Sequence, residues 1–577
     1  MLTHISVKNF KKFDEIDFEL GGTVVLIGPN NSGKTAALQA LALWDIGLKK
    51  WHEKRSGKTS PEKRPGVTIN RRDLVAIPTP NAILLWKDLH IREGSRNGEG
   101  KPITDHVTID IIVSGFTTDK AWKCGLEFDY ANDESIYCRP LRILGEKNQK
   151  RMPIPSEALE VRTAILPPMS GLAAIEEKHM PGRINVLIGE GQTAQVLRNL
   201  CYQISGEEKE PKKDWIELVD QIEHLFGVEL LKPEFISTRG EIIMLYRERS
   251  GVKLDLSSSG RGLQQTLLLL AHLYSNPRTV LLLDEPDAHL EILRQQQTYQ
   301  VITEVAEKRG SQLIIASHSE VVLNEAADRD MVIAFIGKPH RIDDRGSQVL
   351  KSLKRIGFDQ YYLAEHNGWV LYLEGSTDLA ILRAFAETLN HEAKNSLERP
   401  FVYYVGNQPT RARDHFFGLK EAKKDLVGIA IFDKGAELQD HPALKEVMWN
   451  KCELENYLCK REVLMAYAKS SKENGLFGWA EENKRLKAMQ ESIEEITKAK
   501  ETLRNPDPWS DEIKASDDFL DILFPTFFEK LGMTNLMNKS DYHILARLVL
   551  RDSIDPEVIE KLNLIVDIAQ KASPVEQ

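Results

Sequence analysis

Short apolar runs, each followed by a turn and then by a longer segment of mixed polarity, recur along the chain. In the first half they are Val24–Ile27, Val280–Leu283 and Leu313–Ala316, and in the second half they begin the segment 369–385 and recur at 401–406 and 426–435. Apolar runs of this length between turns are typical of buried strands, and their alternation with helical patterns favours parallel sheets. The pattern therefore predicts an α/β protein.

Other segments are predicted from their periodicity. Alternating residues at 108–116 and 124–130 indicate strands, whereas a spacing of three and four predicts helices at 193–205, 214–226 and 266–274. Beyond residue 470 the chain is expected to be helical. The segment 483–503 has the charge pattern of a solvated helix, and 538–552 that of an amphipathic one. No long heptad run lies between Leu43 and Lys232, which argues against a coiled-coil arm.

Composition restricts the class of protein. A chain of 577 residues is long enough for about three or four domains. The net charge of −10 argues against a uniformly basic protein that coats DNA. Five cysteines without a CxxC pair indicate reduced thiols rather than a zinc site or disulfides. The first residues contain no apolar signal segment and no apolar run approaches 18 residues, so we expect a cytoplasmic protein with no membrane association.

The sequence GPNNSGKT follows the first predicted strand and precedes a predicted helix. In this context glycines allow backbone N–H groups to face the β- and γ-phosphates, the lysine adds positive charge, and the threonine hydroxyl reaches Mg²⁺. The pattern predicts that the chain binds ATP or GTP. The expected nucleotide-binding residues are Gly28, Asn30, Asn31, Ser32, Gly33, Lys34 and Thr35, the last of which also serves as a Mg²⁺ ligand.

The segment VLLLDEP, about 250 residues later, supplies the carboxylates that such a site needs. Asp284 is placed to hold Mg²⁺, and Glu285 can orient or deprotonate the attacking water. About thirty residues further on, the next strand leads to His318, which can contact the γ-phosphate. A histidine satisfied within its own loop is the alternative for His318.

The order of GPNNSGKT, SSSGRGLQQ, LLLDEP and SHS resembles that of ABC-type ATPases of the group that contains RecF and the SMC heads. This resemblance implies that Ser259 and Gly260 of one head contact ATP bound to another head. A homodimer or higher homo-oligomer, with ATP at its interface, is therefore expected. A flexible turn is the alternative interpretation of SSSGRG.

In the second half, acidic residues follow two predicted strands. Glu374 and Asp378 lie on either side of a helix start, and Asp433 ends a neighbouring strand. Because the ends of parallel strands meet at one edge of a sheet, we expect these acids to converge. Converging carboxylates repel one another unless a divalent cation joins them, which predicts bound Mg²⁺ or Mn²⁺. Three solvated acids at ordinary turns are the alternative.

The motifs EGSTD and IFD resemble the Toprim fold of topoisomerases, primases and OLD-family nucleases. An ABC ATPase followed by Toprim is the OLD-family arrangement, and the Gabija and PARIS anti-phage proteins are similar. The resemblance implies that Asp433 is the main metal ligand, Glu374 a ligand or general acid/base, and Asp378 a supporting ligand. Glu453 and Glu455, two apart on an expected extended segment, could complete the metal site.

One departure affects this site. Asp433 is followed by Lys434 and Gly435 in place of the usual Asp-x-Asp. The second carboxylate must then come from Glu437, Glu453 or Glu455. Otherwise one metal acts alone and hydrolysis could depend on Lys434. Lys539 resembles a late lysine of OLD-type Toprim domains, with an ordinary surface lysine as the alternative.

The expected domains are an ABC-type ATPase at 1–340 with an α/β insertion at about 45–235, a linker at 341–368, a Toprim domain at 369–470 and a helical part at 471–577. A basic stretch at 49–66 is either a nucleic-acid contact or a solvated loop.

The sequence-based hypothesis is an ATP-gated, metal-dependent nuclease that cuts DNA or RNA in anti-phage defence, where a partner defence protein is also conceivable. The alternative is a RecF-like repair or sensor ATPase whose Toprim domain binds without cutting. A primase is disfavoured because the cysteines offer no zinc module. A topoisomerase is disfavoured because nothing marks a tyrosine nucleophile.

Overall fold

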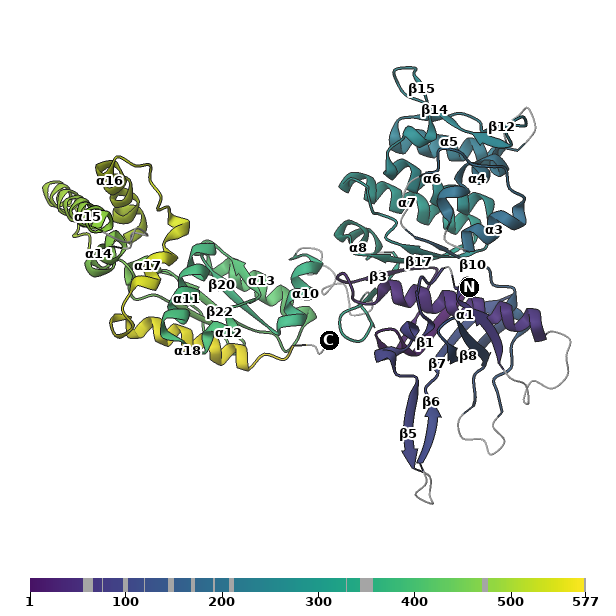
Figure 1. Cartoon of the computed structure of the whole chain (residues 1–577), viewed down its shortest axis with the longest axis horizontal. Helices are drawn as coiled ribbons and strands as arrows, with labels where there is room; N and C mark the ends of the chain where they lie inside the picture. The colour runs from purple at the N-terminus through teal and green to yellow at the C-terminus, as the bar shows by residue number, and fades with distance from the viewer. Residues whose placement is uncertain are drawn as a thin grey trace. The chain divides into compact units, whose positions relative to one another are not determined.

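A computed structural model describes residues 1–55, 66–74, 76–96, 102–118, 120–143, 150–167, 172–189, 192–206, 212–327, 329–342, 356–469 and 476–574. The chain divides into two compact units, Met1–Leu350 and Lys351–Gln577 (Figure 1). The GKT of the basic stretch, at 57–59, lies outside the described residues, as does most of that stretch.

The first unit is organised around a mixed sheet in the order β10-β16-β17-β3-β18-β19. Its first five strands are parallel and β19 pairs antiparallel with β18. The three apolar runs predicted as strands in this half are confirmed. The strands are β10 (Thr163–Leu166), β16 (Val280–Asp284), β17 (Gln312–Ser317), β3 (Thr23–Ile27), β18 (Met331–Ala334) and β19 (His340–Arg341).

A second, antiparallel sheet has the order β2-β1-β7-β8-β9-β4. The predicted strands at 108–116 and 124–130 lie within β7 and β8, so residues 45–235 do not form a body of their own. Instead, β4, β7, β8 and β9 extend the sheet that the first two strands begin, and β10 belongs to the mixed sheet. The strands are β1 (Leu2–Phe10), β2 (Phe13–Glu19), β4 (Val67–Asn70), β7 (Ile109–Thr117), β8 (Lys120–Asn132) and β9 (Ser135–Pro140).

Helix α1 (Lys34–Arg55) lies between these two sheets (Figure 1). Seven of the eight residues from Ala37 to Trp44 are buried, and they lie on all sides of the helix. They pack with apolar residues of both sheets in one core. A helix that is apolar on all sides is buried on all sides. The core therefore fixes the helix that begins at the phosphate loop.

A group of helices covers the other face of the mixed sheet (Figure 1). The predicted helices at 214–226 and 266–274 are confirmed as α5 and α6, whereas the one predicted at 193–205 is a 3-10 turn, Thr193–Gln195, followed by α4. The helices are α3 (Pro181–Gly189), α4 (Leu197–Ser205), α5 (Lys213–Phe226), α6 (Arg261–Ser275), α7 (Ile292–Arg309) and α8 (Glu320–Ala326). Smaller elements are α2 (Ser156–Leu159), the hairpins β5–β6 (Arg92–Arg96, Pro102–His106) and β12–β13 (Glu234–Ile236, Glu241–Ile243), and the sheet β11-β14-β15 (Glu229–Leu230, Leu245–Arg247, Lys253–Asp255).

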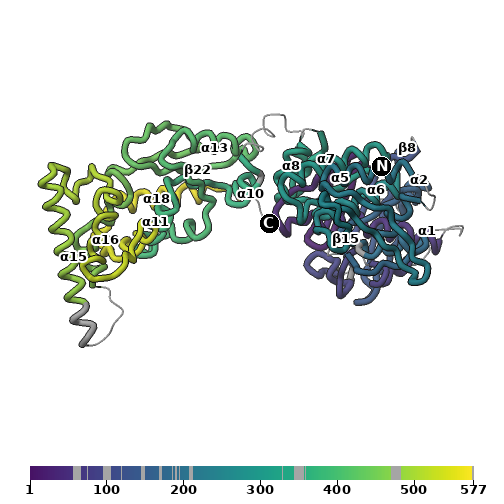
Figure 2. The backbone as a smooth tube through the Cα atoms, turned by 90° about the horizontal axis from the view of Figure 1, so that it is seen from above, coloured from purple at the N-terminus to yellow at the C-terminus, as the bar shows by residue number. Residues whose placement is uncertain are grey.

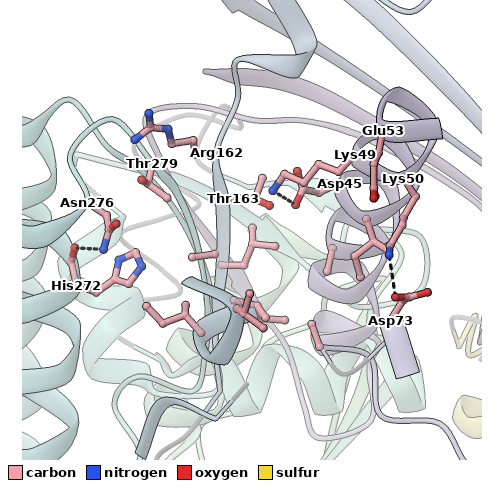
Figure 3. Close-up of a pocket in the computed structure, with 18 of the residues that line it drawn as sticks. Asp45, Lys49, Lys50, Glu53, Asp73, Arg162, Thr163, His272, Asn276 and Thr279 are labelled. Carbon is pink, nitrogen blue, oxygen red and sulfur yellow. Dashed lines mark hydrogen bonds and ion pairs between the residues drawn. The ribbon is translucent and has the colours of Figure 1, made fainter. Parts of the chain in front are cut away.

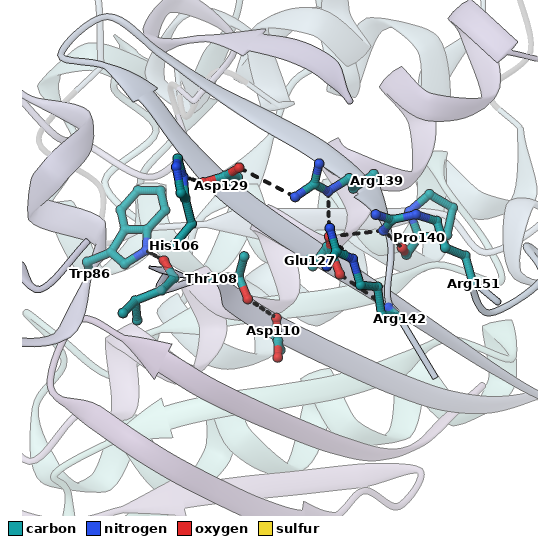
Figure 4. A network of polar contacts seen from close by, with 11 residues as sticks. Trp86, His106, Thr108, Asp110, Glu127, Asp129, Arg139, Pro140, Arg142 and Arg151 are labelled. Atoms are coloured by element: carbon teal, nitrogen blue, oxygen red, sulfur yellow. Dashed lines mark hydrogen bonds and ion pairs between the residues drawn. The ribbon is translucent and has the colours of Figure 1, made fainter. Parts of the chain in front are cut away.

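An ion-pair network ties β8 to β9 and to the segment that follows β9 (Figure 4). The buried carboxylate of Glu127 pairs with Arg139, with Arg151 at 2.9 Å and with Arg142 at 3.9 Å. Three guanidinium groups around one carboxylate offset the cost of burying its charge. This network is structural.

The second unit contains a parallel sheet in the order β21-β20-β22-β23, as the sequence predicts. Helices α11 and α18 pack on one face and α10 and α13 on the other (Figure 2). The strands are β20 (Trp369–Leu373), β21 (Val402–Tyr404), β22 (Val427–Phe432) and β23 (Leu444–Met448). The helices are α10 (Phe358–Asn367), α11 (Ser376–Leu389), α12 (Ala393–Ser396), α13 (Pro409–Ala422) and α18 (Pro556–Gln570).

Helices α14 (Arg461–Lys469), α15 (Leu476–Thr502), α16 (Asp521–Leu531) and α17 (His543–Leu548) complete this unit. The predicted helix at 483–503 lies largely within α15, although Met489 and Ile493 are buried against its neighbours.

Two expectations for this unit are wrong. The linker expected at 341–368 contains α10, and its residues 343–355 lie outside the described part. The helix expected at 538–552 is broken into a 3-10 turn, α17 and another 3-10 turn. Across the described ranges, we find no helix long and apolar enough to cross a membrane.

Candidate functional site

The phosphate loop connects β3 to α1 at the C-terminal edge of the mixed sheet. Gly33 has a φ of +107°, and a Cβ at this position would lie 2.7 Å from the ring of Phe13, so only glycine fits. Lys34 Nζ donates to the carbonyl oxygens of Gly28 at 2.6 Å and Pro29 at 2.8 Å. Ser32 Oγ is buried with no hydrogen-bond partner among the described residues. A loop with an unsatisfied hydroxyl and a folded-back ammonium group is suited to accept phosphate oxygens.

Asp284 and Thr35 meet at this loop as the sequence predicts. Thr35 Oγ1 donates to Asp284 Oδ1 at 2.9 Å, which brings a hydroxyl and a carboxylate together where Mg²⁺ would bind. Burial raises the pKa of Asp284. Burial also lowers the pKa of Lys34, although the charge of Glu285 opposes this effect. Both groups are therefore poorly hydrated, and a bound nucleotide and its cation would supply the charges that water does not.

The expected water-activating residue and the expected sensor lie side by side. His318 Nδ1 is 3.4 Å from Glu285 Oε1, and both side chains are partly exposed. Glu285 follows β16 and His318 follows β17, and both therefore lie at the same edge of the sheet as the phosphate loop.

Sequence reasoning missed Asp287, three residues after Asp284. Its side chain is 5% exposed and accepts a hydrogen bond from Ser317 Oγ at 2.9 Å, so it links the loops after β16 and β17. Burial raises the pKa of Asp287. Lys12 was also missed, and its ammonium group donates to the carbonyl of Asn31 in the phosphate loop. Asp287 lies next to a recognised motif, but no local pattern marks Lys12.

Ser259 and Gly260 lie immediately before α6, and Gly260 is exposed. Ser259 Oγ donates to the carbonyl of Leu256 at 2.7 Å. Neither residue interacts with the phosphate loop of its own chain in the interactions described. Such a turn at a helix start has backbone N–H groups suited to an anion.

A buried network that the sequence did not reveal holds this turn. The Asp255 carboxylate accepts from Ser257 N at 2.9 Å and from Arg198 Nη2 at 2.9 Å. Arg198 is 1% exposed, and its Nη1 donates to the carbonyl of Ala173. Glu176, equally buried, accepts from the backbone of Arg198 and from Asn199. The turn before α6 is thus tied to α4 and to the segment 173–176.

In the second unit, Glu374 and Asp433 directly follow the adjacent parallel strands β20 and β22. Their carboxyl groups share a hydrogen bond. Asp378, in the first turn of α11, accepts from the backbone N–H of Glu374 at 2.9 Å and of Gly375 at 3.2 Å. The expectation that these acids converge agrees with this arrangement.

We call the group of Glu374, Asp378 and Asp433 the acidic site. Repulsion and burial favour the protonated form of its carboxyl groups. Burial, then the hydrogen bond and charge of Glu374, raise the pKa of Asp433 to about 9. The charges of Asp378 and Glu453 act in the same direction. Burial, followed by the charge of Glu453, raises the pKa of Glu455 to about 8. Burial is also the largest cause that raises the pKa of Asp378 to about 6.

The segment that carries Glu453 and Glu455 is not extended. Leu454–Tyr457 is a 3-10 turn that Asn456 caps through a bond from Glu453 N at 3.0 Å. Both glutamates are nevertheless 4% exposed, and their charges act on the acidic site. Lys539 Nζ donates to Ser516 Oγ at 3.0 Å. Burial opposes a rise in the pKa of Lys539, but the charge of Glu455 and of other acids raises this pKa. The Lys539 side chain is nevertheless 44% exposed, so its role at the site and the alternative of a surface lysine both stay predictions.

The departure from Asp-x-Asp has a structural counterpart. Lys434 Nζ is 2.6 Å from Glu512, which holds it in an ion pair. Glu437 is exposed and its charge acts on Arg413. Of the three candidates for the second carboxylate, Glu453 and Glu455 interact with the acidic site.

Within the described ranges, no group of three or more His, Cys, Asp or Glu side chains has the geometry of a metal-binding site. The donor set is nevertheless composed of oxygen atoms, and two of its carboxyl groups are close enough to share a hydrogen bond. Oxygen donors suit Mg²⁺ and Mn²⁺, and a cation would take the place of the shared proton.

The raised pKa values predict how pH affects stability. In the unfolded chain these carboxyls titrate near pH 4, so above that pH the folded state retains protons that the unfolded state has lost. Without metal, the free energy of unfolding should therefore fall as pH rises from about 4 to about 9. Each unit by which folding raises the pKa of one carboxyl group contributes about 1 kcal/mol to this fall. Calorimetric unfolding of the wild type and of Asp433→Asn measures the difference. A wild type that is less sensitive to pH than the variant would contradict this prediction.

A hollow on the other side of the first unit is a separate feature (Figure 3). This cavity of about 650 Å³ is lined by residues of the C-terminal half of α1, of β10 and of α6, including Asp45, Thr163 and His272. It lies at the N-terminal ends of β10 and β16, away from the phosphate loop at their opposite edge. It is therefore not the nucleotide site.

Two family models match the first unit. One is described as "AAA ATPase domain" and matches residues 1–49, and the other as "AAA domain, putative AbiEii toxin, Type IV TA system" and matches residues 193–324. Together with the phosphate loop and the Asp284–Glu285 pair, they show that the first unit contains a P-loop ATPase domain of the AAA/ABC-like kind.

Among curated proteins, the OLD nuclease of Thermus scotoductus (strain ATCC 700910 / SA-01) is 24% identical over 339 residues, which cover 56% of this chain and 59% of that protein. The chain is thus a distant relative of an OLD nuclease and spans 59% of its length. Solved structures that match include the SMC head domain from Thermotoga maritima, with 15% identity, 59% of this chain and 98% of that chain covered, and a TM-score of 0.32. Another is an Smc head domain bound to the C-terminal domain of ScpA derived from Pyrococcus furiosus, with 14% identity, coverage of 59% and 96%, and a TM-score of 0.34.

Proposed function

We propose that the chain is an ATP-dependent, divalent-metal-dependent nuclease of the OLD type, with its nuclease site in a Toprim domain. The observation that carries this proposal is the position of Glu374 and Asp433 directly after the adjacent parallel strands β20 and β22. This acidic site lies in a different unit from the phosphate loop. The first unit would therefore bind and hydrolyse ATP, and the second would hydrolyse nucleic acid at a separate site.

At the acidic site, Glu374, Asp433 and Glu453 would hold Mg²⁺ or Mn²⁺, with Asp378 and Glu455 in support. A bound cation would supply Lewis-acid activation of a phosphodiester and a nucleophile at neutral pH. Asp378 fixes the backbone at Glu374 through its two hydrogen bonds. Lys539 supplies a positive charge that interacts with the charges of Glu453 and Glu455.

At the nucleotide site, Lys34 would exchange its two carbonyl partners for phosphate oxygens, and Glu285 would orient the attacking water beside His318. Ser259 and Gly260 would contact ATP on a second copy of the chain, because they do not contact their own phosphate loop in the described interactions. ATP would then control access to the acidic site by joining two ATPase units. DNA or RNA as substrate and a role in anti-phage defence follow from the resemblance to OLD-family proteins.

Arg198 tests the role of the turn before α6. We expect Arg198→Met to lower kcat for ATP hydrolysis by about 10- to 100-fold, because the turn loses its anchor, with little change in KM for ATP. Arg309→Met removes a comparable ion pair to Asp214, at 2.6 Å, and serves as a control that should keep kcat. A KM increase as large as the fall in kcat would show that Arg198 acts on ATP binding instead.

The proposal itself is tested by incubating the full chain with plasmid, linear DNA and total tRNA, with Mg²⁺ or Mn²⁺ and with or without ATP. We expect metal-dependent cleavage of at least one substrate. No cleavage under any of these conditions would refute the nuclease assignment.

A second function is a RecF-like ATPase whose second unit binds nucleic acid without cutting. The lack of a ready three-ligand metal group among the described residues favours it. Calorimetry with Mn²⁺ separates the two functions, since a nuclease should bind Mn²⁺ and Asp433→Ala should not. Absence of Mn²⁺ binding to the wild type would support the second function.

A further inference from the structure

Three lysines on different elements around the acidic site form ion pairs with one short segment, 511–517. Lys434 is 2.6 Å from Glu512, Lys451 is 3.0 Å from Asp511, and Lys539 is 3.4 Å from Asp517. Lys434 follows Asp433, Lys451 precedes the turn with Glu453, and Lys539 starts a distant 3-10 turn. All three lysines thus border the acidic site and pair with the same segment.

The same segment is docked on the acidic site through its backbone. Ser516 N donates to Glu453 Oε1 at 2.6 Å, and Cys452 N donates to the carbonyl of Asp511 at 2.8 Å. Asn456 Nδ2 donates to the carbonyl of Ile513 at 3.0 Å. The backbone is therefore held independently of the three acidic side chains.

The three carboxylates remain accessible to solvent. The side chains of Asp511, Glu512 and Asp517 are 59%, 68% and 54% exposed. Ion pairs between exposed groups contribute little to stability and are readily exchanged. Another anion can therefore replace these carboxylates while the backbone of the segment stays in place.

We propose that Lys434, Lys451 and Lys539 form a row that binds the phosphates of a nucleic acid strand beside the acidic site. In the chain without nucleic acid, the segment 511–517 occupies this row with carboxylates in place of phosphates. Six residue steps span at most about 22 Å, which limits the row to a few consecutive phosphates. The nature of the ligand rests on the proposed function.

The chain offers a matched control for this competition. Lys530 and Glu495 form another exposed pair in the same unit, at 2.7 Å, with side-chain exposures of 29% and 62%. They join α16 to α15 and are not bonded to the segment 511–517. Glu495→Gln changes the net charge by the same amount as Glu512→Gln.

Fluorescence anisotropy of labelled single-stranded DNA and RNA 30-mers with the full-length protein in EDTA measures binding without cleavage. We expect Glu512→Gln to lower Kd by about two- to fivefold, because the phosphate no longer competes with a carboxylate. We expect Lys434→Gln to raise Kd and to reduce the slope of log K against log salt by about 0.7. Glu495→Gln and Lys530→Gln should change neither quantity.

Equal effects of Glu512→Gln and Glu495→Gln, or an unchanged salt slope in Lys434→Gln, would overturn the phosphate row. If the wild type cleaves nucleic acid while these variants behave like the controls, only the row is wrong. If no variant binds DNA or RNA and the wild type cleaves neither, the row and the proposed function fall together.

Discussion

Lys34→Ala should abolish ATP binding by the full-length protein. The ammonium group is buried in the phosphate loop, where its present partners are two carbonyl oxygens. Loss of a buried charged partner costs about 3–5 kcal/mol, which corresponds to a Kd increase of about 10²- to 4 × 10³-fold. Equilibrium binding of a fluorescent ATP analogue measures this change.

Lys49→Ala is the matched control. Lys49 lies on the same helix, about 22 Å from Lys34 at 1.5 Å per residue, and pairs with Asp45 at 2.6 Å. It should keep the wild-type Kd. Undiminished ATP binding by Lys34→Ala would contradict the assignment of the phosphate loop.

Asp433→Ala should abolish metal-dependent cleavage of nucleic acid while it preserves ATP hydrolysis. Asp433 interacts with Glu374, Asp378 and Glu453, so its removal takes away the group common to the acidic site. Loss of one group that stabilises developing charge lowers rates by about 10²- to 10³-fold, and loss of a metal ligand should cost at least as much. Single-turnover cleavage with Mn²⁺ and a parallel phosphate-release assay measure the two activities.

Glu437→Ala distinguishes the alternatives for the second carboxylate. Glu437 is exposed and acts on Arg413, so we expect this variant to retain cleavage. If it lost cleavage as completely as Asp433→Ala, Glu437 would be the second carboxylate, and our arrangement of the acidic site would be wrong.

The parts of the fold that the sequence predicts well depend on local patterns. Buried parallel strands such as β16 and β22 consist almost entirely of apolar residues, and the chemical groups Asp284 and Asp433 stand at their ends. Because strand order brings such ends to one edge, two separate sites could be predicted before the structure was available.

The features that sequence analysis missed depend on distant partners. The turn at 454–457 was expected to be extended, but the Asn456 cap and the bond from Ser516 to Glu453 make it a 3-10 turn. Lys434 finds Glu512 78 residues away, and Arg198 reaches Asp255 across 57 residues. No spacing rule relates such pairs. Similarly, the Asp541 side chain accepts a hydrogen bond from Asn538 N. This bond stabilises a short turn where periodicity indicated a continuous helix.

The burial of α1 on both sides restricts how a bound nucleotide can affect the rest of the first unit. A helix whose leucines and tryptophans interlock with two sheets cannot tilt or slide without repacking both of them. We therefore expect α1 to keep its position when a nucleotide binds, and any mechanical response to arise in elements outside this core.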